Sequence, residues 1–275
     1  MSNLLLRVIT SILLLPVVIY AFWSGGPFLL ALLGLVSLFC SVEISGMVMP
    51  KNNFYLCMAL IFWAGLFGPL VVTQSATHAL ALMSIMFLIS NTIILFRPSL
   101  DQRGLEKLST IFYFTFYVVI GIGCLYWLSE RFISLVFLAC VATWGNDSCA
   151  YFGGRAFGKH PLFKRVSAKK TWEGFIAGAL GSLLIIWALN FFIPHQAWHP
   201  FYGLKLADFL WVGLPAIILA PLGDLIESRL KRIYDAKDAS NILPGHGGLL
   251  DRIDALLLVV PWTAVYAFFI RPLWY

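Results

Sequence analysis

Long apolar runs separated by short polar breaks extend through the whole sequence. A helix needs about 20 apolar residues to cross about 30 Å of hydrocarbon, and most of these runs have that length. The breaks are rich in glycine, proline or charge, as at Ser24–Gly26, Pro50–Asn53 and Arg97–Lys107. This pattern predicts an all-α polytopic integral membrane protein with about nine transmembrane helices, at residues 5–23, 27–46, 54–73, 78–96, 110–128, 132–152, 173–193, 208–226 and 253–271.

Composition excludes an ordinary soluble domain. Of the 275 residues, 60% are hydrophobic and only 12% are charged, whereas soluble domains carry roughly 25% charged residues. The run Leu4–Trp23 is followed by no clear cleavage site, so we expect a first span rather than a signal peptide. The five cysteines form no CxxC pair, which argues against a zinc site.

The distribution of basic residues orients the predicted spans. Lysine and arginine collect in the cytoplasmic loops of membrane proteins. If nine spans alternate in direction, only Arg131, Lys205 and Arg271 fall on one side, which leaves 16 of the 19 basic residues on the other. We therefore predict a cytoplasmic N-terminus, an external C-terminus and an active site on the cytoplasmic side of a bacterial inner membrane.

The polar chemistry lies in the second part of the chain. Residues 1–109 are predicted to form N-terminal transmembrane helices and carry little specific signal beyond hydrophobicity. Residues 110–275 are predicted to form a C-terminal catalytic region with two cytoplasmic loops, at residues 153–172 and 227–252.

The first loop follows an acid at membrane depth. Asp147 lies near the end of a predicted span, and a carboxylate there usually faces a polar cavity. Tyr151 is four residues further and shares its helical face. Six basic residues follow before Thr171 and suit an anionic ligand. They would equally serve to enforce topology or to contact anionic lipid headgroups.

The second loop combines acid, hydroxyl and base. Asp224, Glu227, Ser228 and Lys231 recur at positions i, i+3, i+4 and i+7. If the eighth span continues as a helix, these side chains form one polar stripe at the membrane surface. A span that merely ended there would not need all three kinds of group on one face.

The loop ends in a glycine pair and two further acids. The segment His246–Gly248 allows close backbone approach and positive φ. Asp251 and Asp254 then open the last predicted span, where either acid alone would also suit a helix N-terminus. Carboxylates without cysteine partners favour a hard cation such as Mg²⁺, and the neighbouring lysines and arginines suit phosphate. This combination is typical of phosphoryl or nucleotidyl transfer.

The segment Ser228–Asp254 reads SRLKRIYDAKDASNILPGHGGLLDRID. It resembles, throughout, the signature of the phosphatidate cytidylyltransferases, also called CDP-diglyceride synthases. The first loop resembles the same family at Asn146–Asp147, Ala150–Tyr151 and Lys169–Gly174. The resemblance implies transfer of the cytidylyl group of CTP to phosphatidate, which gives CDP-diacylglycerol and pyrophosphate in phospholipid biosynthesis.

The resemblance also implies a site. Its metal-binding pair would be Asp224 and Asp251, with Mg²⁺ and a possible second cation, and a homodimer is a further implication. The candidate catalytic residues are Lys231, Lys237, Asp238 and Asp254. The candidate substrate-binding residues are Asn146, Asp147, Arg155, Lys169, Lys170, Ser228, Arg232, His246, Gly247 and Gly248. The expected partners are CTP, phosphatidate and the lipid bilayer, with no nucleic acid.

Two other functions compete with this interpretation. A related membrane nucleotidyl- or phosphotransferase would act on another lipid, and the complete signature argues against it. An ion-coupled transporter would use Asp147, Asp224 and Glu227 as ion sites. It predicts internal repeats and broken helices in both halves of the chain, and the sequence shows neither clearly. The chain also lacks a GxxxxGK[ST] loop and a GxSxG elbow.

Overall fold

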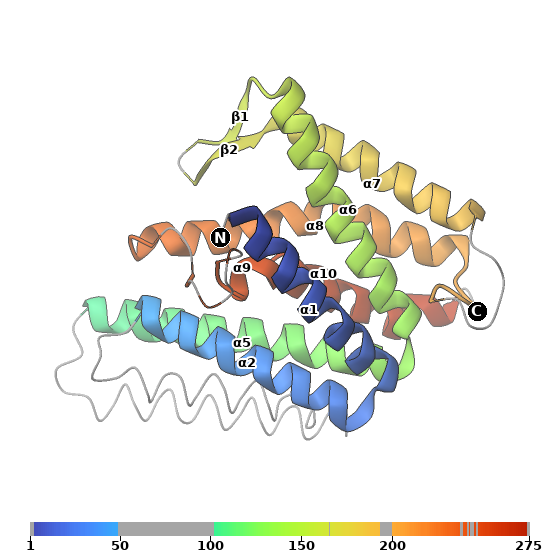
Figure 1. Ribbon diagram of the computed structural model, residues 1–275, viewed down its shortest axis with the longest axis horizontal. Coiled ribbons are helices and arrows are strands. Elements are labelled where there is room, and N and C mark those ends of the chain that lie inside the picture. Colours follow the sequence, from blue (N-terminus) through green and yellow to red (C-terminus); the bar gives the residue numbers. More distant parts are fainter. Residues whose placement is uncertain are drawn as a thin grey trace. The chain divides into compact units, whose positions relative to one another are not determined.

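The computed structural model describes residues 3–48, 102–164, 166–192, 200–236, 239–240, 242, 245 and 247–273 (Figure 1). The chain divides into two compact units. The first contains Met1–Trp127 and Asp238–Leu250, and the second contains Leu128–Lys237 and Asp251–Tyr275. The sequence predicted N-terminal helices at residues 1–109 and a catalytic region at residues 110–275. That division is one of function, and it stays a prediction.

Helices of the first unit come from the N-terminal part of the chain. They are α1 (Asn3–Ser24), α2 (Gly26–Val48) and α5 (Gln102–Arg131), the last of which continues past the unit boundary at Trp127. Gly25 and Gly26 both have positive φ, at 61° and 49°, and this allows the sharp turn between α1 and α2. The predicted spans 54–73 and 78–96 lie outside the described residues.

The second unit is built from helices that pack on one another. Helix α6 (Ile133–Phe157) contacts α7 (Trp172–Phe192), α8 (Leu206–Ile233) and α10 (Leu256–Val265). A short helix, α9 (Leu250–Ile253), precedes α10, and a π-helical turn (Tyr266–Ile270) and a 3₁₀ turn (Arg271–Leu273) follow it. Helices α6 and α8 extend past the predicted span ends at residues 152 and 226, so both predicted polar loops begin as helix.

Glycines allow α6 and α7 to cross at close range. A Cβ atom on Gly178 would lie 2.5 Å from Asn146 Oδ1, and one on Gly181 would lie 2.3 Å from Cys149 Sγ. Small residues permit this kind of backbone approach between membrane helices, where lipid supplies no hydrophobic drive for association. The crossing fixes the part of α6 that carries Asn146 and its neighbour Asp147.

Two prolines interrupt α8, and side chains from other helices compensate for them. Pro221 has no N–H for the carbonyl of Ile217, and that carbonyl accepts a hydrogen bond from Asn146 Nδ2 at 3.2 Å. Pro215 likewise frees the carbonyl of Trp211, which accepts from Trp262 Nε1 at 2.8 Å. Each break in α8 is therefore repaired by a neighbouring helix, α6 or α10.

A small β-hairpin joins α6 to α7 and was not predicted by the all-α assignment. Strand β1 (Pro161–Phe163) pairs antiparallel with β2 (Ser167–Thr171). Glu173 accepts hydrogen bonds at Oε2 from the backbone N–H groups of Lys159 and His160, at 3.1 and 3.2 Å. The first turn of α7 thus anchors the start of the hairpin, and the polar sequence folds here instead of remaining an irregular loop.

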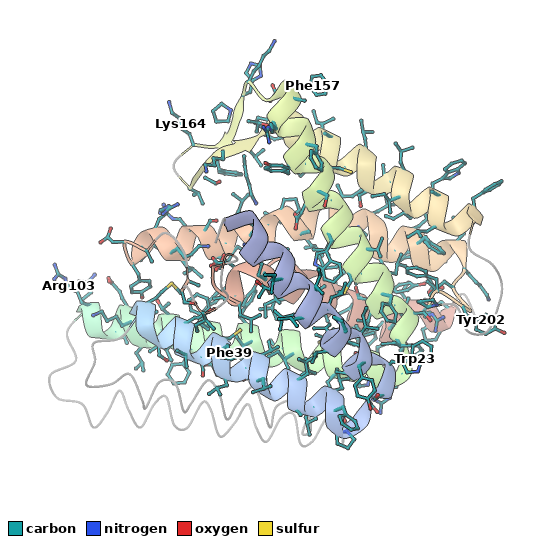
Figure 2. The ribbon with its side chains drawn as sticks, viewed as in Figure 1. Trp23, Phe39, Arg103, Phe157, Lys164 and Tyr202 are labelled. Atoms are coloured by element: carbon teal, nitrogen blue, oxygen red, sulfur yellow. The ribbon has the colours of Figure 1, made fainter. Side chains whose placement is uncertain are left out.

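Six described helices are long and apolar enough to cross a membrane. They begin at Gly26, Gln102, Ile133, Trp172, Leu206 and Leu256, near six of the predicted spans. Within α1 the qualifying apolar stretch is shorter, at Ile12–Ser24. Large apolar side chains point outward along these helices (Figure 2), as expected for a surface in contact with lipid. The chain is thus a helical integral membrane protein, and the number nine stays a prediction.

Candidate functional site

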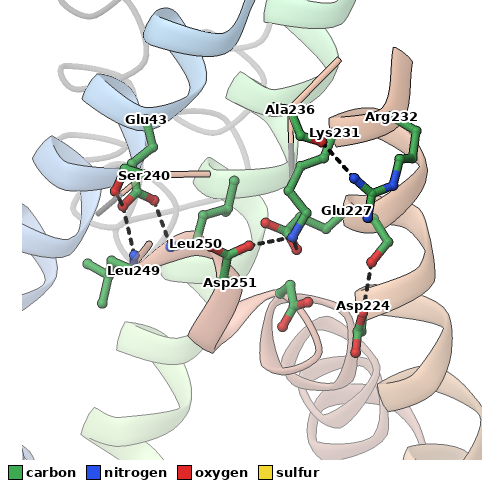
Figure 3. Close-up of polar contacts among 12 residues, drawn as sticks. Glu43, Asp224, Glu227, Lys231, Arg232, Ala236, Ser240, Leu249, Leu250 and Asp251 are labelled. Carbon is green, nitrogen blue, oxygen red and sulfur yellow. Dashed lines mark hydrogen bonds and ion pairs between the residues drawn. The ribbon is translucent and has the colours of Figure 1, made fainter. Parts of the chain in front are cut away.

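The C-terminal third of α8 carries the predicted polar stripe, and the structure confirms it. Ser228 Oγ donates to Asp224 Oδ1 at 3.1 Å, and Lys231 Nζ donates to Glu227 Oε2 at 2.8 Å (Figure 3). Both pairs are four residues apart, so they depend on α8 remaining helical beyond residue 226. Glu227 is 2% exposed and Lys231 is 7% exposed, so both side chains of the second pair are buried.

Lys231 connects α8 to the start of the last helical segment. Its ammonium group donates to Asp251 Oδ1 as well as to Glu227 (Figure 3). Asp251 lies in α9, 20 positions along the chain from Lys231. A buried ammonium ion between two carboxylates is much better compensated than a single buried charge would be. One predicted catalytic residue and one predicted metal ligand are therefore in direct contact.

The first polar region supplies a second lysine. Lys170, in β2, forms an ion pair with Asp224 Oδ2 at 2.6 Å. Asp147, in α6, lies close enough to Asp224 and Lys170 to interact electrostatically with both. The two regions that the sequence singled out thus meet at Asp224.

Asp254 completes the acidic group. A Cβ atom on Gly223 would lie 2.6 Å from the carbonyl oxygen of Asp254, so only glycine lets α8 approach this backbone. Asp254 is buried, and its Oδ1 accepts from the N–H of Ala255 at 2.8 Å. Burial raises the pKa of Asp254 to about 7, and the nearby carboxylate of Asp224 adds to the rise.

Carboxylates outnumber lysines in this group. Five acids (Asp147, Asp224, Glu227, Asp251 and Asp254) are arranged around two lysines (Lys170 and Lys231). Glu227 Oε1 is buried and accepts no hydrogen bond from the described residues, and Asp254 lies beside it. Buried carboxyl groups in excess of lysines favour protons shared between the acids or further cations in the site.

The donor chemistry fits a hard divalent cation. Every acceptor in the group is a carboxylate oxygen, which Mg²⁺ prefers over nitrogen or sulfur. Among the described residues, no three acidic, histidine or cysteine side chains converge as a complete ligand shell. Mg²⁺ commonly needs only one or two carboxylates, because water and substrate phosphates complete its shell.

The glycine-containing part of the signature lies in the first unit. Gly245 and Gly247 have φ values of 76° and 83°, a conformation that other residues rarely adopt. Gly248 is buried. Glu43, from α2, accepts hydrogen bonds from Ser240 and from the backbone of Leu249 and Leu250 (Figure 3).

Other predicted residues are exposed, bond to other partners, or lie outside the described residues. Arg155 and Lys169 are exposed, and Arg155 Nη1 donates to Tyr151 Oη at 3.4 Å. Arg232 Nη1 donates to the carbonyl of Ala236 at 3.0 Å, which closes the end of α8. Asn146 is buried and bonds to α8 as described above, so its amide has a structural partner. Predictions for Lys237, Asp238 and His246 fall outside the described residues.

Two acids were missed as site residues. Glu227 was recognised in the stripe and as an ion site of a transporter, but it was assigned no role in the transfer reaction, although it is among the most deeply buried acids. Glu43 was not considered at all. It is the only charged residue in α2, and a lone acid in an apolar run is costly enough to be a signal of function.

Comparisons with known proteins agree with the chemistry of this group. The model of the cytidylyltransferase family matches residues 5–270. The phosphatidate cytidylyltransferase of Staphylococcus haemolyticus is 32% identical over 263 residues, which is 93% of this chain and 95% of that protein. The phosphatidate cytidylyltransferase of Bacillus subtilis is 37% identical over 185 residues, which covers 66% of this chain and 65% of that protein. Because the family model spans nearly the whole chain, this protein belongs to the cytidylyltransferase family.

Proposed function

We propose that this chain transfers the cytidylyl group of CTP to phosphatidate and releases pyrophosphate. An oxygen of the lipid phosphate forms a bond to the α-phosphorus of CTP, and the bond from that phosphorus to the β-phosphate oxygen breaks. The products are CDP-diacylglycerol and pyrophosphate. The observation that carries the proposal is the group of acids and lysines around Asp224 and Asp251, within a unit of largely apolar helices.

The reaction places little demand on a general base. A phosphate monoester is already anionic near neutral pH, so the nucleophile needs no proton removed. The main obstacle is repulsion between two anionic substrates, and positively charged groups in a dry site reduce it most. Lys170 and Lys231 are the described residues placed to do this, with their ammonium groups held by Asp224 and by Glu227 and Asp251.

Mg²⁺ is the proposed cofactor, and a second cation is an extension of the same proposal. Asp224 and Asp251 would hold the metal, which when bound supplies positive charge to the phosphates of CTP. Each of these carboxylates forms an ion pair with a lysine. We propose that, when the metal binds, the lysines release these carboxylates and pair with substrate phosphate. Each acid and each lysine then still has a partner of opposite charge.

The position of the polar residues suits a lipid substrate. The stripe lies at the end of α8, a helix long enough to cross the bilayer, and a phosphatidate headgroup lies at that depth. The positive charge of the polar segments supports a cytoplasmic side, where CTP is present. A single cysteine at Ser167, in a variant without native cysteines, should react with an impermeant thiol reagent only after the membrane is permeabilised.

One assay tests the proposed reaction. Purified protein is mixed with radiolabelled CTP, phosphatidate and Mg²⁺, and the label is extracted into organic solvent. Lipid-extractable cytidylate that requires phosphatidate supports the proposal. Parallel reactions with a polyprenyl phosphate test the competing lipid acceptor, and the Asp224→Asn variant controls for contaminating enzyme. Transfer to the polyprenyl lipid alone, or no transfer at all by folded protein, would reject the assignment.

A further inference from the structure

Glu43 is an acid in an unexpected place. It lies within α2, whose other residues carry no charge, and its side chain is only 2% exposed. A carboxylate within a transmembrane helix is expensive unless polar groups compensate it. In a sequence that uses only 13 acids in 275 residues, such a position calls for a specific partner.

The partners of Glu43 all belong to the signature segment. Its Oε1 accepts from Ser240 Oγ at 2.6 Å and from the N–H of Leu249 at 2.7 Å (Figure 3). Its Oε2 accepts from the N–H of Leu250 at 2.8 Å. Ser240 Oγ also accepts from the N–H of Ile242 at 3.1 Å. All four bonds lie within the first unit.

These bonds close residues 240–250, the second half of the signature segment, into a ring. One carboxylate holds this stretch at its first residue, Ser240, and again at its end, at Leu249 and Leu250. The glycines at 245 and 247 turn the backbone between these points. Charge-assisted hydrogen bonds of this kind are roughly twice as strong as neutral ones. The backbone at Leu250 is therefore fixed from α2.

Asp251 is the next residue after Leu250. Both lie in α9, the four-residue helix Leu250–Ile253, so a shift of the backbone at Leu250 also moves the side chain of Asp251. Asp251 in turn accepts the hydrogen bond of Lys231. Catalytic groups must be held within a fraction of an ångström, and a displacement of about 1 Å can cost about 100-fold in rate.

We propose that Glu43 is a positioning residue for the transfer reaction: it holds both ends of residues 240–250 and so sets the backbone from which Asp251 projects. This inference rests on the proposed function. It gives α2 a part in catalysis. Glu43 contacts no substrate in this account and acts only through the segment.

Glu43→Gln is the most direct test. A glutamine has one carbonyl oxygen in place of two carboxylate oxygens, so at least one backbone N–H, of Leu249 or Leu250, loses its acceptor. We expect kcat to fall about 10- to 100-fold, with KM for CTP and for phosphatidate changed less than about threefold. Glu43→Asp restores the charge on a shorter arm and should recover part of kcat. Glu106→Gln, the same change at an exposed position of α5, should have no effect.

Ser240→Ala gives a second, milder test. It removes one of the three bonds to Glu43 and should lower kcat by about 2- to 10-fold, the usual range for one hydrogen bond. This variant leaves the carboxylate and both backbone bonds in place, so it should fold even if Glu43→Gln does not. A Ser240→Ala variant with the kcat of the wild type, together with an inactive and unfolded Glu43→Gln, would assign Glu43 to folding and overturn the proposal.

Hydrogen exchange separates positioning from general stability and requires no turnover. In Glu43→Gln, peptides that contain Leu249 and Leu250 should exchange faster, while peptides of α7 and α8 remain as in the wild type. A fall in kcat that merely follows the folded fraction, with faster exchange throughout the protein, would reject the inference. If the wild type fails to transfer cytidylate, the proposed function fails, and the exchange data still decide whether Glu43 holds the segment.

Discussion

The two ends of α8 both carry buried acids, but the acids are compensated very differently. At the N-terminal end, Asp208 is fully buried and accepts from the N–H of Lys205, from Tyr266 Oη and from Arg271 Nε, at 2.7, 2.8 and 2.9 Å. The guanidinium of Arg271 also lies 5.1 Å from the centre of the Phe132 ring. At this end, one acid is matched by one cation and by two neutral donors.

At the C-terminal end the balance is not complete. Among the described residues, Asp224, Glu227 and Asp251 form ion pairs with two lysines, and one oxygen of Glu227 accepts no hydrogen bond. A buried charge network that serves only stability tends to be fully satisfied. Charged residues in a membrane helix therefore indicate a functional site mainly where neighbouring groups of opposite charge do not balance them. The following experiments test this difference between the two ends of α8, beginning with the largest expected effect.

The largest effect is expected from the proposed metal ligands. Asp224→Asn and Asp251→Asn keep the size of the side chain and remove its charge, so transfer should fall about 1,000-fold while the protein stays folded. Turnover is measured across a Mg²⁺ titration. Asp235→Asn is the matched control, because Asp235 is exposed and has a φ of 54°, which asparagine tolerates well. Normal activity and Mg²⁺ dependence in both site variants would show that the metal is held elsewhere.

Asp208→Asn should affect stability instead of chemistry. Its burial and its three hydrogen bonds indicate that this acid stabilises the packing of α8. Removing its charge breaks the ion pair with Arg271 and should cost about 3 kcal/mol. Thermal unfolding in detergent should shift down, with kcat per folded molecule near that of the wild type. A selective loss of kcat would erase the distinction between the two ends.

Lys231→Ala tests the positive half of the site. It removes the ammonium group that joins Glu227 to Asp251 and should lower kcat about 10- to 100-fold or raise KM for CTP. Lys205→Ala is the control, since that side chain is exposed at the opposite end of α8. Equal losses in both variants, accompanied by lower unfolding temperatures, would point to folding and not to phosphate compensation.

The smallest effect concerns Asp254 and pH. Its pKa of about 7 in the folded state exceeds the ordinary value of 3.8, so folding favours the protonated form. The stability that this group contributes is therefore present below about pH 4 and lost as the pH rises through 7. With chelator present, Asp254→Asn should unfold at a higher temperature than the wild type at pH 8, by about 2–4 °C per kcal/mol. The difference in unfolding temperature between the variant and the wild type should be smaller at pH 5. A difference that does not change with pH would contradict the raised pKa of Asp254.

The sequence predicted the helical membrane fold and much of the acidic group, because both depend on local patterns. Apolar length predicted the spans, and the spacing of Asp224 and Lys231 predicted a shared face on α8. The hairpin was not predicted because it depends on Glu173, which accepts hydrogen bonds from the amides of Lys159 and His160, 14 and 13 positions earlier in the chain. The substrate-binding role of Asn146 stays a prediction, but the bond from its Nδ2 to a carbonyl that Pro221 leaves free on another helix was not predicted. Such relationships arise only from packing.

The bonds of Glu43 have a consequence for how the protein is made. Its partners lie 197 to 207 positions further along the chain, and ribosomes add about 5–20 residues per second. For roughly 10–40 s at those rates, α2 must remain in the bilayer with its acid unable to reach those partners. Insertion of the N-terminal helices is therefore an intermediate stage of assembly, and the arrival of the last segment completes it. A chain truncated before Ser240 would leave this carboxylate without its partners and would be a natural target for quality-control proteolysis.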